Sequence, residues 1–121
     1  MAAKKKQADA SQAEHYTYRI AWSAHDSEFI ATVVEFPSLS WFAQTRESAL
    51  DGLTSVVEEV LRDMLAEGEE IPKPWDERKF SGKLNLRLGA ELHKKVALDA
   101  AERQESINSY IVKQLGQANA G

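Results

Sequence analysis

Apolar and polar residues alternate from Tyr16 to Ser23, a pattern that predicts a half-buried β-strand. Turn-forming residues follow, and the β-branched run Glu28–Phe36 predicts a second strand that pairs with the first as a hairpin. After a proline, Leu39–Gln44 predicts a third strand. Trp41 and Phe42 could form an exposed binding patch; alternatively, because neighbouring residues of a strand face opposite sides, one ring joins the core while the other lies at the surface.

A helix should follow the third strand. Thr45 is a good N-cap, and apolar residues recur at helical spacing from Ala49 to Leu65, so one side of this helix should pack on the sheet. Gly68 stands where a left-handed residue ends a helix at little cost. The proline-containing run Ile71–Trp75 cannot continue the helix and predicts an extended connector.

The pattern changes again at Gly82–Leu88, where alternation predicts a strand with a polar face and an apolar face. The polar face carries Lys83, Asn85 and Arg87, and the apolar face carries Leu84, Leu86 and Leu88. Two amphipathic helices should follow, the second with Ser106 as its N-cap. Such a short strand is not stable alone, so it gains most by pairing with a copy of itself. The expected apolar core of that dimer is Leu84, Leu86, Leu88, Leu92, Val96, Ile107, Tyr110 and Ile111.

Charge divides the 121-residue chain in the same way. The formal net charge of −4 combines residues 1–15, with three basic and two acidic residues, a body over residues 16–81, with six basic and thirteen acidic residues, and residues 82–121, with six basic and four acidic residues. An acidic body joined to a mildly basic module suggests that the two halves meet different partners. The basic polar face of residues 82–88 suits nucleic acid.

No enzyme chemistry is apparent. The three His are scattered without metal-ligand spacing, and the chain has no GxSxG elbow, P-loop or GxGxxG motif. We therefore expect no catalytic residues, no metal and no cofactor. Cysteine is absent, no apolar run approaches 18 residues, and the N-terminus has no apolar signal region, so we expect a cytoplasmic protein without a membrane partner.

The strand–helix–helix segment resembles the ribbon-helix-helix DNA-binding proteins of the Arc/MetJ type, with Ser106-Ile107-Asn108-Ser109-Tyr110-Ile111 similar to their helix-start signature. In that family two protomers pair their strands as a ribbon that enters the major groove. The resemblance implies that Lys83, Asn85 and Arg87 contact DNA bases, and that Ser106 and Ile107 contact phosphate. Gln104 stands where this family usually has Gly.

Residues 16–115 as a whole resemble the HicB antitoxin family. The matching runs are Phe29-Ile30-Ala31, Glu35-Phe36-Pro37, Thr45 with Ala49-Leu50, Ile71-Pro72-Lys73-Pro74, and Phe80-Ser81-Gly82-Lys83 leading to Glu91-Leu92-His93. The resemblance implies an α+β fold, in which an N-terminal β-β-β-α(-β) HicB-like domain precedes a C-terminal ribbon-helix-helix dimerisation module. We expect a disordered tail over 1–15, a partial ribonuclease-H-like domain over 16–75, a linker over 76–80 and the DNA-binding domain over 81–117.

The resemblance implies the antitoxin of a type II toxin–antitoxin system. It would bind and neutralise a HicA-like mRNA-cleaving toxin, and as a homodimer, which could pair further into a tetramer, it would repress its own operon by binding operator DNA. One alternative is a stand-alone ribbon-helix-helix transcriptional regulator whose front domain serves oligomerisation or sensing. Another is an interaction protein that only dimerises. Steep weakening by salt would distinguish DNA binding from dimerisation through leucines.

Overall fold

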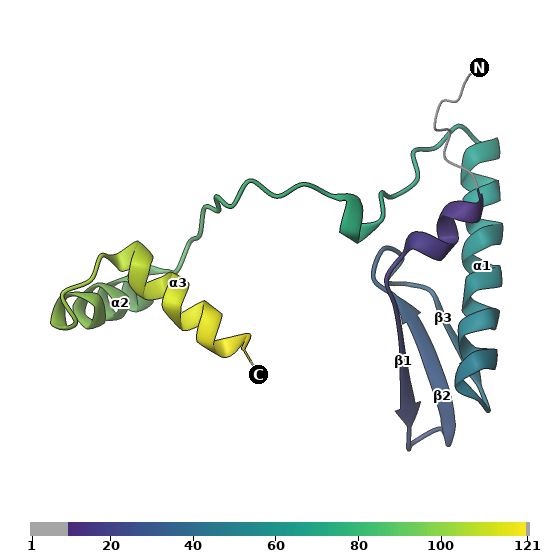
Figure 1. Cartoon of the computed structure of the whole chain (residues 1–121), viewed down its shortest axis with the longest axis horizontal. Coiled ribbons are helices and arrows are strands. Elements are labelled where there is room, and N and C mark those ends of the chain that lie inside the picture. The colour runs from purple at the N-terminus through teal and green to yellow at the C-terminus, as the bar shows by residue number, and fades with distance from the viewer. Residues whose placement is uncertain (1–9, 121) are drawn as a thin grey trace. The chain divides into compact units, whose positions relative to one another are not determined.

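The computed structural model describes residues 10–120, which divide between two compact units: unit 1, which ends at Phe80, and unit 2, which begins at Ser81. Unit 1 contains the elements η1 (Ala10–His15), β1 (Tyr18–Ser23), β2 (Glu28–Val33), β3 (Ser40–Ala43), α1 (Arg46–Ala66) and η2 (Trp75–Glu77). Unit 2 contains α2 (Ala90–Glu102) and α3 (Ile107–Ala118). Figure 1 labels the helices and strands of both units.

Unit 1 is built on a three-stranded antiparallel sheet in the order β1-β2-β3. The register places Ile20 opposite Ala31 and Ala31 opposite Trp41, so these side chains share one face of the sheet. Helix α1 runs along this sheet (Figure 1). The predicted β-β-β-α order is therefore confirmed, although β1 and β2 are shorter than the alternation suggested.

Helix α1 begins and ends with the expected caps. The Thr45 side chain accepts a hydrogen bond from the Ser48 N–H at 3.0 Å, which satisfies one of the free donors of the first turn. At the other end Gly68 has φ +75°, and the N–H groups of Gly68 and Glu69 bond back to the carbonyls of Leu65 and Met64. This pair of bonds is a Schellman motif, which satisfies two carbonyls that the helix itself leaves free.

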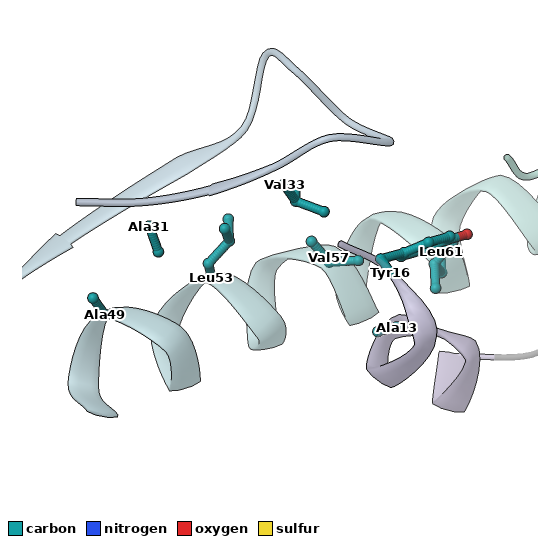
Figure 2. Close-up of a cluster of buried hydrophobic side chains, with 8 residues drawn as sticks. All are labelled: Ala13, Tyr16, Ala31, Val33, Ala49, Leu53, Val57 and Leu61. Atoms are coloured by element: carbon teal, nitrogen blue, oxygen red, sulfur yellow. The ribbon is translucent and has the colours of Figure 1, made fainter. Parts of the chain in front are cut away.

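One hydrophobic core joins α1 to the sheet, and Figure 2 shows its side chains. Residues four apart on α1 lie on one side of the helix, so the recurring apolar positions form one buried line. The buried members of the core are Ala13, Tyr16, Ala31, Val33, Ala49, Leu53, Val57 and Leu61.

The N-terminal boundary of this core differs from the prediction. Residues 10–15 were expected to belong to a disordered tail, but they form η1, and Ala13 is completely buried. The Tyr18 hydroxyl donates a hydrogen bond to the Ala13 carbonyl at 2.7 Å. Because these contacts join η1 to distant parts of the chain, no local pattern predicts them. The first nine residues of the predicted tail lie outside the described residues.

Trp41 and Phe42 do not divide into one buried and one exposed ring. Their exposed fractions are 42% and 41%, although they face opposite sides of β3. Trp41 faces α1, and a methyl group added at Gly52 would overlap its indole ring. Gly52 therefore allows the ring to approach the helix closely, which is the reason for a glycine in the middle of α1.

The connector after α1 has more structure than predicted. Trp75–Glu77 forms the short helix η2, which overlaps the expected linker over 76–80, and Pro74 is fully buried. No strand forms between residues 69 and 80, so the optional last strand of the β-β-β-α(-β) prediction is absent there.

Unit 2 has the two predicted helices but lacks the strand that was predicted before them. Residues 82–88 carry no strand in this single chain. The physical reason is that a strand is defined by ladder hydrogen bonds, and the described part of unit 2 offers these residues no second strand. Residues 82–88 are irregular as a result. After them, helices α2 and α3 pack against each other.

Candidate nucleic-acid and dimer interface

The three predicted base readers, Lys83, Asn85 and Arg87, are all exposed. Within residues 10–120, none of their side chains forms a hydrogen bond or ion pair. The Lys83 backbone N–H donates to the Ser81 hydroxyl at 3.1 Å, which leaves the ammonium group free. These side chains are therefore accessible to a partner, but the single chain does not hold them on one face.

The apolar residues between them are also exposed. Leu84 is 79% and Leu86 is 54% exposed, and only Leu88 is half-buried. Exposed leucines in succession cost free energy because each leaves apolar area in contact with water. These residues therefore lack the cover that the predicted dimer core requires.

Leu86 and Leu88 line a groove of about 520 Å³ in unit 2. Ile107 and Ile111 of α3 and His93 of α2 line it as well. The groove thus brings together four of the eight predicted dimer-core residues. Of the other four, Tyr110 is buried, Val96 is half-buried, and Leu84 and Leu92 are exposed.

The start of α3 has the geometry that a capped helix needs. The Ser106 hydroxyl accepts a hydrogen bond from the Ser109 N–H at 3.0 Å, so Ser106 is the N-cap and Ile107 is the first residue of the helix. Backbone N–H groups in the first helical turn have no partner within the helix and can bind an anion. Ser106 and Ile107 thus lie at the start of α3, and their contact with phosphate stays a prediction.

The turn before α3 contains Gln104 in the left-handed conformation, with φ +57°. The N–H groups of Gln104 and Glu105 bond to the carbonyls of Ala101 and Ala100, which is a second Schellman motif. Gln104 therefore occupies the position that usually holds Gly, as the sequence suggested, and it does so with a backbone conformation that disfavours a side chain.

Two polar contacts in unit 2 were not found from the sequence. Glu105 forms an ion pair with Lys113 at 3.0 Å, and one oxygen of the Glu105 carboxylate is buried without a hydrogen-bond partner. The Tyr110 hydroxyl donates to the Asp99 carboxylate at 3.2 Å, and burial together with this carboxylate raises the pKa of the Tyr110 phenol. Residues eleven apart across a turn have no periodic signal, so sequence spacing does not indicate this bond.

Unit 1 presents a different surface. The carboxylates of α1, such as Asp51, Glu59 and Asp63, lie on its exposed side. Within residues 10–120 the described ion pairs are His15–Glu77, Lys95–Asp99 and Lys113–Glu105, so none of the α1 carboxylates is paired. The acidic side of the helix keeps its negative charge available to a partner.

The model of the HicB family matches residues 65–115. This segment runs from the end of α1 through the connector to α3, and over these residues the chain is similar to the HicB family. The match indicates, in general terms, an antitoxin of a toxin–antitoxin system, a class that is generally non-enzymatic. The motifs noted at residues 29–50 lie outside the matched residues.

Searches of curated proteins and of solved structures gave no match. Among the described helices, none is long and apolar enough to cross a membrane. Over the same residues there is no group of three or more His, Asp or Glu side chains placed to hold a metal ion.

Proposed function

We propose that the chain is the antitoxin of a type II toxin–antitoxin system. Unit 1 binds and neutralises a HicA-like mRNA-cleaving toxin, and unit 2 binds operator DNA as a homodimer and represses the operon. The observation that carries the DNA-binding half is the exposure of Leu84 and Leu86 beside the unpaired Lys83, Asn85 and Arg87.

Dimer formation through unit 2 is supported by its poor core. Among residues 81–120 the buried hydrophobic residues are Ala100 and Tyr110, whereas the described part of unit 1 buries eight residues in one cluster. Residues 82–88 lack partners for their backbone groups and cover for their leucines. A second copy supplies both, because it can form an antiparallel strand pair with them.

Base readout follows from strand alternation. Once the leucines of residues 82–88 face the dimer core, Lys83, Asn85 and Arg87 face outward on the ribbon. Arg and Lys bond well to guanine, and Asn bonds to adenine, in the major groove. Phosphate contacts from the start of α3 would then fix the ribbon in register.

Toxin binding by unit 1 is supported by charge. Residues 16–81 carry six basic and thirteen acidic residues, and the carboxylates of α1 are unpaired within residues 10–120. A ribonuclease must bind RNA and therefore presents a basic surface, which complements this acidic one.

The direct-readout claim is tested by Arg87→Ala in a gel-shift titration with DNA from upstream of the chain's own gene. We expect the affinity to fall by about 1–3 kcal/mol, because a bidentate contact to guanine is lost. Arg19→Ala is the matched control, since Arg19 is an exposed arginine of β1 outside unit 2. Equal affinity of the Arg87→Ala variant and the unsubstituted chain would refute base contact by Arg87.

The toxin claim is tested by co-purification with the product of any toxin-sized neighbouring reading frame. We expect a small basic protein, bound to unit 1, to co-purify with the chain. Failure to recover one, together with retained DNA binding, would favour the stand-alone transcriptional regulator instead.

A further inference from the structure

Glu35, just after β2, is the one charged residue among those described that is buried, with an exposed fraction of 9%. Its carboxylate accepts hydrogen bonds from the Thr17 N–H at 2.9 Å, the Thr17 hydroxyl at 3.1 Å and the Trp75 N–H at 2.7 Å. A buried carboxylate is stable only when such donors replace its water. Glu35 thus joins three segments that are far apart in the sequence.

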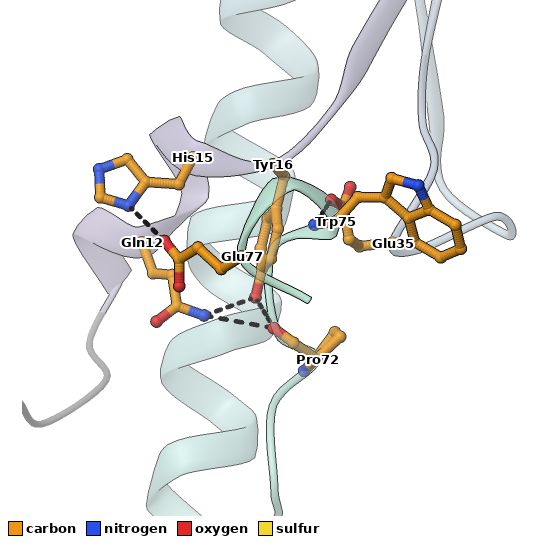
Figure 3. A network of polar contacts seen from close by, with 7 residues as sticks. All are labelled: Gln12, His15, Tyr16, Glu35, Pro72, Trp75 and Glu77. Carbon is orange, nitrogen blue, oxygen red and sulfur yellow. Dashed lines mark hydrogen bonds and ion pairs between the residues drawn. The ribbon is translucent and has the colours of Figure 1, made fainter. Parts of the chain in front are cut away.

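A second set of contacts holds the connector next to that carboxylate. The Tyr16 hydroxyl and the Gln12 amide donate to the Pro72 carbonyl at 2.7 and 3.2 Å, as Figure 3 shows. His15 lies 3.7 Å from the Glu77 carboxylate in the same view. The residues following α1 are therefore attached to η1 as well as to the sheet.

Trp75 extends this attachment along the chain. The Arg78 guanidinium lies 4.4 Å from the centre of the Trp75 ring, and its Nε donates to the Lys73 carbonyl at 3.2 Å. The Phe80 ring lies 5.9 Å from the Trp75 ring. Beyond Phe80 the next residues are Ser81 and Gly82, and Gly82 has φ +87°.

We propose that the Glu35–Trp75 bond is a latch that fixes residues 75–80 to unit 1 and confines the flexible junction before unit 2 to Ser81 and Gly82. Opening the latch frees residues 75–82. Because an extended residue spans at most about 3.6 Å, the free chain then lengthens from about 7 Å to about 29 Å. Tether length sets the effective concentration of one tethered module at the site of another, so the latch controls how independently the two units act.

The test is hydrogen–deuterium exchange on the full chain carrying Glu35→Gln, which is uncharged and whose single amide oxygen cannot replace both carboxylate oxygens. The informative amides are Trp75, Glu77 and Arg78, which donate to Glu35, the Pro74 carbonyl and the Trp75 carbonyl. We expect their exchange to rise about tenfold or more, since hydrogen bonds to charged groups are among the stronger ones. Exchange of the α1 amides should rise less than exchange of these three.

Glu28→Gln is the matched control, because Glu28 lies on the same strand and its carboxylate bonds only to the exposed Gln44 side chain at 3.2 Å. Unchanged exchange at residues 75–78 in the Glu35→Gln variant overturns the proposal. Faster exchange in α1 to the same extent also overturns it, because Glu35 would then stabilise the whole of unit 1 rather than the connector.

A second variant, Trp75→Leu, keeps the backbone N–H that bonds to Glu35 but removes the ring that contacts Arg78 and Phe80. We expect the amide of residue 75 to stay protected, while trypsin cleaves after Arg78 or Lys79 severalfold faster than in the unsubstituted chain. Unchanged cleavage would show that the ring does not hold the end of the connector, and would overturn that part of the latch.

Discussion

Gln104 adopts the left-handed conformation in the turn between α2 and α3. For a residue with a side chain, the left-handed conformation costs about 1–2 kcal/mol of steric strain. Glycine avoids this strain but loses roughly 0.5–1 kcal/mol more backbone entropy on folding. The difference favours glycine, and the two hydrogen bonds of the turn do not involve the Gln104 side chain.

Gln104→Gly should therefore stabilise unit 2 by roughly 0.5–1 kcal/mol, measured by native-state hydrogen exchange of α3 amides at a fixed protein concentration. Gln104→Ala is the control, since it removes the same side chain beyond Cβ but keeps the conformational penalty. Equal stability of the two variants would contradict the strain assigned to this position.

Gly52 and Gly116 are both helical glycines, but their surroundings differ. A Cβ at Gly52 would overlap the Trp41 ring, whereas a Cβ at Gly116 has no heavy atom within 4 Å. We expect Gly52→Ala to destabilise unit 1 by about 1–3 kcal/mol through overpacking. Gly116→Ala should instead stabilise α3 by up to about 1 kcal/mol, because alanine is the better helix former.

Tryptophan fluorescence during urea unfolding measures the first effect, since Trp22, Trp41 and Trp75 all belong to unit 1. Helical circular dichroism measures the second. A Gly52→Ala variant as stable as the unsubstituted chain would show that the Trp41 ring moves away at no cost.

At the scale of elements, Glu35 ties the end of β2 to the connector, and its charge should make this attachment depend on pH. Burial alone would raise the pKa of the Glu35 carboxyl, but the hydrogen bonds from Thr17 and Trp75 outweigh burial and hold the pKa below its ordinary value. A group with a lowered pKa in the folded state stabilises the fold above its unfolded-state pKa of about 4.3, and loses that contribution as the pH falls through its folded-state value.

The free energies of unfolding of the unsubstituted chain and of Glu35→Gln should therefore differ by a constant amount between pH 8 and pH 5. The difference should shrink below about pH 4.3. Urea titrations at each pH, followed by tryptophan fluorescence, measure it. A difference that grows on acidification would show that the carboxylate is not the stabilising form.

The order of elements could be predicted where the signal is local. Alternation predicted the strands of unit 1, the Thr45 and Ser106 caps predicted the starts of α1 and α3, and Gly68 predicted the end of α1. Contacts between distant residues could not be predicted in this way. The burial of Ala13 and the bond from Tyr16 to Pro72 depend on tertiary packing, and they convert part of an expected tail into η1.

The candidate site was predictable to the same extent. The alternation of residues 82–88 indicated which side chains are polar and which are apolar, but not that the single chain would leave both kinds exposed. A β-ribbon needs two strands, so its formation depends on a second molecule rather than on local sequence.

At the scale of the whole molecule, the two units differ in how completely they bury apolar residues. Both units leave large apolar side chains exposed, but unit 1 also encloses a core of eight buried residues, whereas Ala100 and Tyr110 are the buried apolar residues in the described part of unit 2. Leu86 and Leu98 of unit 2 are similarly exposed, at 54% and 57%. Leu86 lines the groove with Ile107 and Ile111, but Leu98 lies two positions from the buried Ala100 and therefore on another side of α2.

Sedimentation equilibrium of the full chain tests the central claim most directly. We predict a particle of twice the 13.5 kDa chain mass, or a higher multiple if dimers pair. Leu86→Lys should yield a monomer that no longer binds DNA, because it places a charge in the dimer core, while Leu98→Lys should leave the assembly intact. A monomeric unsubstituted chain, or a Leu86→Lys variant that associates as strongly as Leu98→Lys, would contradict the ribbon dimer.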